Sequence, residues 1–527
     1  MHTKQFSSGK RILSSLLLSA AIVLPSVGQA EEITLLSQDG TINIKGEFVS
    51  FEENIYLVRT ALGELRLSAE RVRCEGAACP VFEPVEADVV LAGSDTVGTG
   101  VVPLMLEGYA GFLEAESTLS TTDKENEVLA NFVGDFGFGD PLGVYRVSSE
   151  NSASAFSSLL KGEAQIGMSS RRIRPDEARA LRDAGAGNMI SPDQEHIVAI
   201  DSIVVITHPD NPVRSVSMED LAKIYAGTIT NWSQVGGPDL AIKVIDRDGG
   251  GTRRTFLDRL MPDNANVTSV ASVAVDNNEM AQLVTEEPGA IGYTGYAFQR
   301  GAKPLTLINE CGIGMAPDPF SARTEEYALQ RRLYLYNRAD GVDQATQSFI
   351  DYARSANADD VIVKAGFIDL GVDRRAQPSD GERAKQLTGQ NVDAFEAGYM
   401  QQMLGLMENH DRLSTTFRFR TGSSKLDERA VIDMERLTTY LEEQGPDTKI
   451  KLVGFTDSVG AFQSNQVLAE GRAAQVMEEL AAYAGDRLAG VEMSTAAFGE
   501  IAPSACNASD SGRAINRRVE VWIQAAG

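Results

Sequence analysis

The stretch Val244-Ile245-Asp246-Arg247-Asp248-Gly249-Gly250-Gly251-Thr252-Arg253-Arg254-Thr255-Phe256 decides the fold of the region around it. It reads as a short apolar strand, a triple glycine and the first turns of a helix. Glycines let a backbone wrap closely around a ligand, and free N–H groups at a helix start favour an anion. Arg247 adds a guanidinium group that fits two oxygens of one anion. The stretch indicates either an oxyanion cradle or an ordinary strand–turn–helix corner.

Length and composition bound the remaining possibilities. A chain of 527 residues is too long for one hydrophobic core, and 43% hydrophobic with 23% charged residues is typical of folded globular domains. The net charge of −26 repels nucleic acid, so we expect no nucleic-acid partner. An anion site in such a protein must work through local donors and dipoles, because the overall field opposes it.

The amino-terminal residues predict export. Lys4, Lys10 and Arg11 precede an apolar run over residues 12–24, and the small residues of Gly28-Gln29-Ala30 follow. This pattern is typical of a secretory signal peptide over residues 1–30, with an uncleaved anchor as the alternative. We therefore expect a periplasmic protein, associated with the outer membrane.

Residues 31–82 predict a small all-β module. Apolar residues alternate along short segments separated by turns, and Cys74 and Cys79 are close enough to form a disulfide in an oxidising compartment. The sequence does not decide whether Cys311 and Cys506 are bonded to each other or are buried thiols. It also leaves open the role of the module and the oligomeric state.

An α/β pattern begins at residue 87. Strand, turn and helix recur at residues 87–112, 164–181 and 244–260, which is typical of an α/β sheet with ligands at the strand ends. The loop Gly93-Ser94-Asp95-Thr96-Val97-Gly98 is similar to a P-loop, but Thr99 stands where the nucleotide-binding lysine must be. The loop thus excludes ATP and still suits a bare oxyanion. Ser152 is expected to cap the helix that follows it.

Three further motifs resemble the PstS-like phosphate-binding proteins of bacterial ABC importers, a family of periplasmic binding proteins. They are residues 217–237, 289–293 and 331–336, and the resemblance spans residues 87–375. It implies two α/β lobes joined by crossing strands, with phosphate clamped between them and an ABC permease as a partner. No cofactor and no metal are implied.

Carried over residue by residue, the resemblance implies phosphate contacts from both lobes. The implied set is Thr96, Val97, Ser152, Ser170, Arg247, Gly250, Gly251 and Thr252. Gly250 stands where the family often has serine, and Ser170 where many members have an aspartate that accepts the proton of phosphate. The sequence therefore leaves open whether the anion is phosphate or a related oxyanion.

A polar linker and a helix are expected over residues 376–411, before a last domain over residues 412–527. There Gly454-Phe455-Thr456-Asp457, Asn465, Arg472 and Asn516-Arg517-Arg518-Val519 are similar to the OmpA-like peptidoglycan-binding domain.

Asp457 at a strand end and Arg472 on the next helix offer opposite charges to a zwitterionic amino acid. The diaminopimelate of peptidoglycan stem peptides has such a headgroup, and the family binds it at these positions, with Thr456 and Asn465 assisting. The alternative is a plain salt bridge between Asp457 and Arg472, worth no more than about 1 kcal/mol.

The sequence thus predicts a multidomain fold: a small all-β module, a two-lobed α/β periplasmic-binding-protein domain and a C-terminal α/β OmpA-like domain. The predicted function is a periplasmic substrate-binding protein that binds phosphate or a related oxyanion and is tethered to peptidoglycan. The alternative is a structural envelope linker whose central domain has lost or changed its ligand. An enzyme is not expected, because His196, His208 and His410 lie in no catalytic or metal-binding motif.

Overall fold

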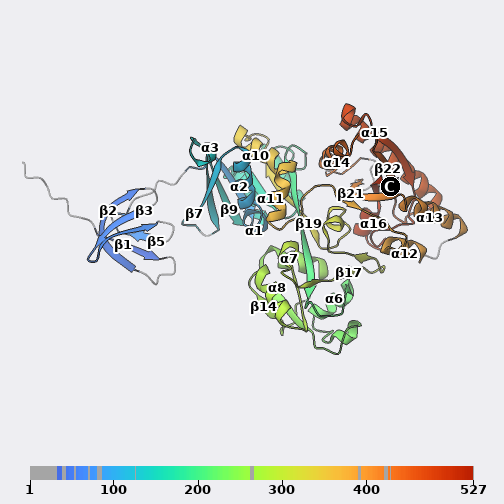
Figure 1. Ribbon diagram of the computed structural model, residues 1–527, viewed down its shortest axis with the longest axis horizontal. Helices are drawn as coiled ribbons and strands as arrows, with labels where there is room; N and C mark the ends of the chain where they lie inside the picture. Colours follow the sequence, from blue (N-terminus) through green and yellow to red (C-terminus); the bar gives the residue numbers. More distant parts are fainter. Residues whose placement is uncertain are drawn as a thin grey trace, which may run out of the picture. The chain divides into compact units, whose positions relative to one another are not determined.

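The computed structural model describes residues 32–37, 43–52, 55–68, 72–76, 78–79, 86–124, 126–261, 266–389, 393–419, 425–427 and 429–525 (Figure 1). The chain divides into two compact units, residues 1–85 and residues 86–527. The predicted signal peptide over residues 1–30 lies outside the described residues. Within the described ranges, no helix combines the length and apolar character needed to cross a bilayer.

The first unit is the predicted all-β module. Its five antiparallel strands lie in the order β4-β3-β2-β1-β5. Alternate residues of β1 and β3 fill its core, among them Leu35 and Val58, as expected for strands with one buried face. The predicted disulfide between Cys74 and Cys79 is present. The strands are β1 (Glu32–Ser37), β2 (Asn43–Glu52), β3 (Ile55–Thr60), β4 (Gly63–Ser68) and β5 (Val72–Glu75).

The second unit begins with an α/β lobe. Parallel strands β10, β6 and β9 form its centre and antiparallel β8 and β7 its edge. Its elements are β6 (Val89–Ser94), α1 (Asp95–Gly98), α2 (Val102–Phe112), β7 (Glu116–Thr121), β8 (Glu127–Val133), α3 (Gly134–Gly137), β9 (Pro141–Glu150), α4 (Ser152–Lys161), β10 (Ile166–Ser169), α5 (Pro175–Asp183), α10 (Gln344–Arg354), η3 (Ala356–Ala358) and α11 (Asp359–Lys364). This is lobe one.

A second α/β lobe, lobe two, is inserted in the first. Its core is separate and includes Trp232, Phe256 and Tyr293, all fully buried. Its elements are β12 (Ser215–Ser217), α6 (Met218–Tyr225), η1 (Trp232–Val235), β13 (Lys243–Arg247), α7 (Gly250–Leu260), β14 (Ser272–Ala274), α8 (Asn277–Glu286), β15 (Ala290–Gly295), η2 (Tyr296–Phe298), β16 (Lys303–Pro304), β17 (Thr306–Ile308), β18 (Gly314–Met315) and α9 (Pro319–Arg323).

Two long strands run through both lobes. They are β11 (Glu195–Thr207) and β19 (Gln330–Asn337), which pair antiparallel and link the sheet of one lobe to that of the other. All thirteen residues of β11 are buried, as expected for a strand covered on both faces. The crossing strands predicted from the sequence are therefore present.

The C-terminal domain has a sheet of order β20-β21-β24-β22-β23 covered by two long helices, α14 and α15. Its elements are β20 (Arg374–Arg375), α12 (Glu382–Thr388), α13 (Ala394–Met407), β21 (His410–Arg418), α14 (Ala430–Gln444), β22 (Lys449–Gly454), α15 (Phe462–Ala484), η4 (Gly485–Leu488), β23 (Glu492–Ala497), α16 (Asp510–Asn516) and β24 (Arg518–Gln524). The predicted fold class is confirmed in all three of its parts.

The C-terminal domain contacts both lobes. A disulfide joins Cys311 of lobe two to Cys506, which decides the pairing that the sequence left open. On lobe one, Arg436 of α14 forms an ion pair with Asp359 at 2.6 Å, and Ile432 of the same helix belongs to the apolar core beneath α4 and α5.

Buried ion pairs link the end of lobe two to the C-terminal domain. Glu325 contacts Arg332, Arg418 and Arg429, and Glu326 contacts Arg412 at 2.7 Å. Burial by itself would raise the pKa of both carboxyl groups. The surrounding guanidinium groups outweigh burial and hold both pKa values below the ordinary value of 4.5.

Removal of the long-range disulfide by Cys311→Ala with Cys506→Ala should lower the free energy of unfolding of residues 86–527. The bond spans 195 residues of chain, so the chain-entropy model gives a loss of roughly 5 kcal/mol. Urea unfolding measures the change. The matched variant Cys74→Ala with Cys79→Ala lies in the other unit and should leave this transition in place. An unchanged midpoint in the first variant would contradict the contribution of the bond.

Acid should loosen the second unit. The stabilising free energy of Glu325 and Glu326 is present above their ordinary pKa of 4.5 and is lost as the pH falls toward the lowered folded pKa, about 2 for Glu326. Burial raises the pKa of Asp433 to about 6, so protonation of this carboxyl group in mild acid increases the free energy of unfolding. The net loss of stability should therefore begin below about pH 5 and not near pH 6. Urea unfolding from about pH 7 to about pH 3 measures it.

In that series, Glu326→Gln should be less stable at neutral pH by up to about 3–5 kcal/mol, because Arg412 loses one of its two buried carboxylate partners and keeps only Glu520. The free energy of unfolding of this variant should also fall less as the pH is lowered. Equal acid dependence in both proteins would show that Glu326 is not the responsible group.

Candidate functional site

The starts of α1 in lobe one and α7 in lobe two lie close together. In lobe one, α1 follows β6 and α4 follows β9, and these parallel strands end at one edge of the sheet. In lobe two, α7 follows β13. Residues 93–98, expected as a loop, instead complete β6 and form the turn of α1, which brings Thr96 to a helix start.

The two lobes touch through Thr96 and Gly251. A Cβ atom placed on Gly251 would lie 3.0 Å from the Thr96 Oγ1 atom, so a side chain at this position would displace the Thr96 side chain slightly. The N-cap of α7 is Gly249, which has no side chain to bind the first amides of the helix. No side chain thus caps the first N–H groups of α7, and the oxyanion cradle predicted from the triple glycine stays a prediction.

The guanidinium group between the lobes belongs to Arg331 of β19. Its Nη2 atom lies 3.3 Å from Thr96 Oγ1, and its Nη1 atom donates to Thr255 Oγ1 at 2.6 Å and to the Gly251 carbonyl at 3.3 Å. Asp201 on β11 pairs with it at 2.8 Å. The sequence reasoning did not assign Arg331 to the site, although it stands in one of the motifs that carried the resemblance.

Ser152 and Ser170 lie together in lobe one. Their Oγ atoms are 3.2 Å apart, and the Ser170 amide donates to Ser152 Oγ at 3.1 Å. Ser152 is not the N-cap that the sequence predicted. Asn151 caps α4 by accepting from the amides of Ala153 and Ser154, and the Ser152 hydroxyl group bonds Ser170 instead.

Arg247 lies elsewhere in lobe two. Its Nη1 atom donates to Asn277 Oδ1 at 2.7 Å and its Nη2 atom to the Val275 carbonyl at 3.3 Å. Over the described residues, no hydrogen bond or ion pair joins Arg247 to Thr96 or Ser152. The structure thus brings Arg331, and not Arg247, into contact with both lobes.

The remaining predicted residues lie at helix starts. Val97 is fully buried in α1, and Gly250 and Thr252 stand in the first turn of α7. The hydroxyl groups of Ser94, before α1, and of Ser202, next to Asp201, are buried without a hydrogen-bond partner among the residues described. A buried hydroxyl group without a partner is costly, so these two mark places where a polar ligand atom would be favourable.

The second predicted site lies at the end of β22 in the C-terminal domain. Asp457 Oδ2 accepts from Arg517 Nη1 at 2.8 Å, so the expected alternative of a direct salt bridge to Arg472 is not what forms. Asn465 donates to the Asp457 carbonyl at 3.2 Å and to the carboxylate of Glu500. Thr456 is buried, and its Oγ1 atom has no partner among the described residues.

Arg472 reaches this site from α15. Its Cζ atom is 5.1 Å from the centre of the Phe419 ring, and its buried Nη1 atom has no hydrogen-bond partner in the described part of the chain. Burial lowers the pKa of Arg472, the charge of Arg517 lowers it further, and Asp457 opposes both. Close packing of α15 on β22 sets this geometry, since a Cβ on Gly454 would lie 2.1 Å from the Ala469 carbonyl oxygen.

Comparison with protein families assigns both regions. The model for the PBP superfamily domain matches residues 83–357, and that for the OmpA family matches residues 418–517.

Among individual proteins, the chain is similar to the phosphate-binding protein PstS of Bacillus subtilis, with 27% identity over 239 residues that cover 44% of this chain and 74% of that protein. For PstS of Borreliella burgdorferi the figures are 27% over 186 residues, 34% of this chain and 66% of the relative. Its C-terminal region is similar to outer membrane porin F of Pseudomonas aeruginosa, with 37% identity over 114 residues, 22% of this chain and 32% of the porin.

Among solved structures, an ABC-type phosphate transport receptor from Vibrio cholerae aligns over 53% of this chain and 99% of its own, with 24% identity and a TM-score of 0.40. The family models, and not this alignment, carry the assignment. The chain belongs to the PBP superfamily, with a PstS-like phosphate-binding-protein domain followed by an OmpA family domain.

Proposed function

We propose that this protein binds phosphate or a related tetrahedral oxyanion between its two lobes. The observation that carries the proposal is the meeting of Thr96, Gly251 and Arg331 at the uncapped start of α7. Ser152 and Ser170 supply hydroxyl groups from lobe one, and Thr252 and the amides of Val97 and Gly250 complete the donors. Arg247 remains a candidate contact from lobe two.

The same proposal gives the C-terminal domain the role of holding peptidoglycan. Asp457 accepts the ammonium group of a diaminopimelate headgroup, and Arg472 donates to its carboxylate through the Nη1 atom that has no partner in the described chain. Arg517 and Glu500 join Asn465 and Thr456 around this pair. The contact with Arg517 keeps the Asp457 carboxylate in place before the ligand binds.

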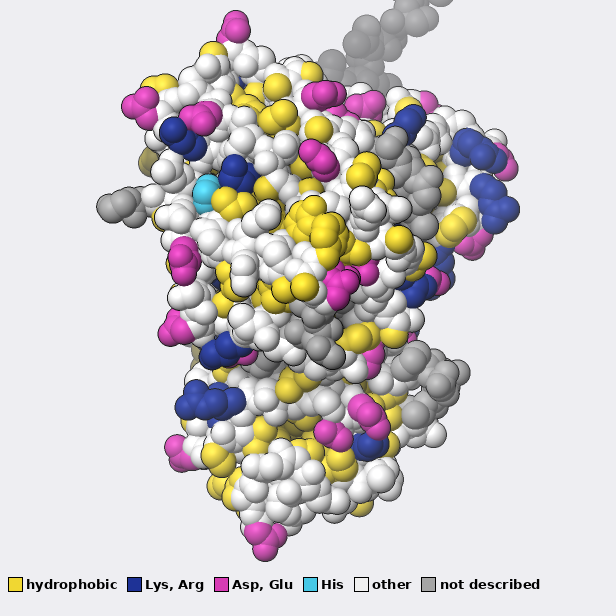
Figure 2. Space-filling model, turned by 90° about the vertical axis from the view of Figure 1, so that its right-hand side faces the viewer, with side chains coloured by type: hydrophobic (Ala, Val, Ile, Leu, Met, Phe, Trp, Pro, Cys, Tyr) yellow, Lys and Arg dark blue, Asp and Glu magenta, His cyan; other side chains and the backbone are white. Residues whose placement is uncertain are grey.

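The setting that fits both sites is the periplasm, with export by the predicted signal peptide and attachment to the cell wall. An ABC permease is then the natural receiver of the anion. On the face in Figure 2, basic side chains stand singly or in small groups among acidic and apolar ones, which suits neither nucleic acid nor a broad anionic surface. The protein acts by binding, not by catalysis.

A second candidate is a structural envelope linker whose central domain no longer takes the anion. One observation favours it: Asp201 already neutralises Arg331 at 2.8 Å. The cleft would then depend on helix-start amides and hydroxyl groups alone. Both candidates bind the cell wall. They differ in whether an anion binds between the two lobes.

Calorimetry with inorganic phosphate on the full chain separates the two candidates. Thr96→Val and Ser152→Ala should each weaken phosphate binding by roughly 10- to 100-fold, because each removes a hydrogen bond to a charged ligand. The control Ser157→Ala changes an exposed serine of the same helix, whose hydroxyl group donates only to the Ser154 carbonyl, and should bind as the wild type does. No heat with phosphate, sulfate or phosphonate would leave the linker as the function.

Sedimentation with purified peptidoglycan tests the wall contact. The wild type should pellet with the wall, and Arg472→Ala should shift most of the protein to the supernatant, because the carboxylate of the stem peptide loses its partner. The matched control is Arg487→Ala, an arginine of the same domain that pairs with Glu435 and Glu442. Equal pelleting of Arg472→Ala and the wild type would defeat the assignment.

A further inference from the structure

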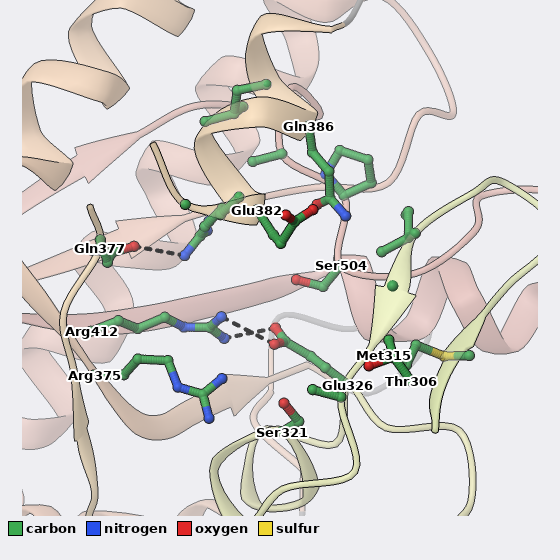
Figure 3. A pocket seen from close by; sticks show the side chains of 18 of the residues that line it. Thr306, Met315, Ser321, Glu326, Arg375, Gln377, Glu382, Gln386, Arg412 and Ser504 are labelled. Atoms are coloured by element: carbon green, nitrogen blue, oxygen red, sulfur yellow. Dashed lines mark hydrogen bonds and ion pairs between the residues drawn. The ribbon is translucent and has the colours of Figure 1, made fainter. Parts of the chain in front are cut away.

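A large cavity lies where lobe two meets the C-terminal domain. Its volume is about 1110 Å³, above the range of roughly 300–1,000 Å³ of most small-molecule sites. One wall comes from β17, β18 and α9, and the other from α12, β21 and residues 502–504. Neither the cleft residues nor Asp457 and Arg472 line it. Figure 3 shows its polar side chains pointing inward from both walls.

The charge of the cavity is opposite to that of the whole protein. Its charged lining residues are Arg214, Arg375, Arg383 and Arg412 against Glu326 and Glu382, whereas the chain carries 48 basic and 74 acidic side chains. A local excess of arginine in an acidic protein indicates an anionic ligand.

Beneath the cavity, three guanidinium groups share two carboxylates. Glu520 pairs with Arg383 at 2.9 Å, with Arg412 at 3.1 Å and with Arg518 at 2.7 Å, and Glu326 pairs with Arg412. The pKa of Arg518 is lowered to about 10: burial lowers it, Glu520 and Glu326 partly offset burial, and the charges of Arg383 and Arg412 add to the lowering.

A neighbouring cluster of buried ion pairs has equal numbers of positive and negative charges. There Arg332, Arg418 and Arg429 face Glu325, Asp427 and Asp433. In the described chain the surplus of positive charge is thus on the side of the cavity. A buried charge without a counter-charge is costly, and an anion held against Arg383 and Arg412 would supply that counter-charge.

The remaining lining fits a peptide. Gln386 offers both donors and an acceptor, and Ser321 and Ser504 add hydroxyl groups, whereas the amide of Gln377 already bonds His410 and Arg383 (Figure 3). Among the described strands, β18 pairs only with β17 and is the edge of its sheet, so its backbone can pair with an extended chain. Phe320, Met315 and Leu387 also line the cavity, with little of each side chain exposed.

We propose that this junction cavity binds a short extended peptide with free carboxylates, which Arg375, Arg383 and Arg412 receive while the peptide backbone lies along β18. Arg375 is placed for this role, since its guanidinium group lies 4.0 Å from the centre of the Phe320 ring and is held by Asp318. The site is independent of the anion cleft and of the wall contact at Asp457.

Calorimetry on the full chain tests the proposal. The probe is the tetrapeptide of alanine, glutamate, alanine and alanine, acetylated at its amino end and with both carboxylates free. The comparison peptide has glutamine for glutamate and a carboxyl-terminal amide. The acidic peptide should bind, and the uncharged one should bind at least roughly tenfold more weakly. Equal binding of the two peptides, or no heat at about 1 mM of the acidic one, would overturn the proposal.

Two variants locate the site. Arg375→Gln should weaken binding of the acidic peptide by at least roughly tenfold, and Gln386→Trp should abolish it by filling the cavity from α12. Gln347→Trp on the exposed face of α10 is the matched control and should bind as the wild type does. Retained phosphate binding shows that each variant is folded. Wild-type peptide affinity in Gln386→Trp, or loss of peptide binding in Arg472→Ala, would place the peptide elsewhere and refute the cavity.

Discussion

The antiparallel pairing of β11 with β19 is the constraint on which the second unit depends. These strands link the sheets of the two lobes, and the ion pair between Asp201 and Arg331 sits on them. Arg331 therefore reaches Thr96 of one lobe and Gly251 of the other from the element that both lobes share. Glu325 and Glu326 lie just before β19 and contact arginines of the C-terminal domain. Residues on or next to this one strand therefore contact both lobes and the C-terminal domain.

The attachment of the C-terminal domain is polar and buried. Removal of charges from water costs free energy that attraction alone repays only when every group has its partners. The cluster around Glu325 meets this condition with three charges of each sign, whereas the cluster at the junction cavity has one guanidinium group in excess over the described residues. The cluster around Glu325 therefore serves only to attach the domain. The cluster at the junction cavity would be stabilised by a further negative charge.

The local features were predictable from the sequence, and the long-range ones were not. The strand–glycine–helix stretch at residues 244–256 and the bond between Cys74 and Cys79 follow from neighbours in the chain. The bond between Cys311 and Cys506 and the placement of Arg331 depend on how distant segments pack. Arg247 was the nearest guanidinium group in sequence, yet Asn277 and Val275 hold it within its own lobe. In the same way Arg517, sixty residues along, occupies the partner position of Asp457.

The loop after β23 has a mechanical consequence. Glu500 contacts Asn465, which also donates to the Asp457 carbonyl, while Cys506, a few residues on, is bonded to Cys311 of lobe two. Force applied to the C-terminal domain at this loop therefore reaches lobe two directly, through a covalent bond.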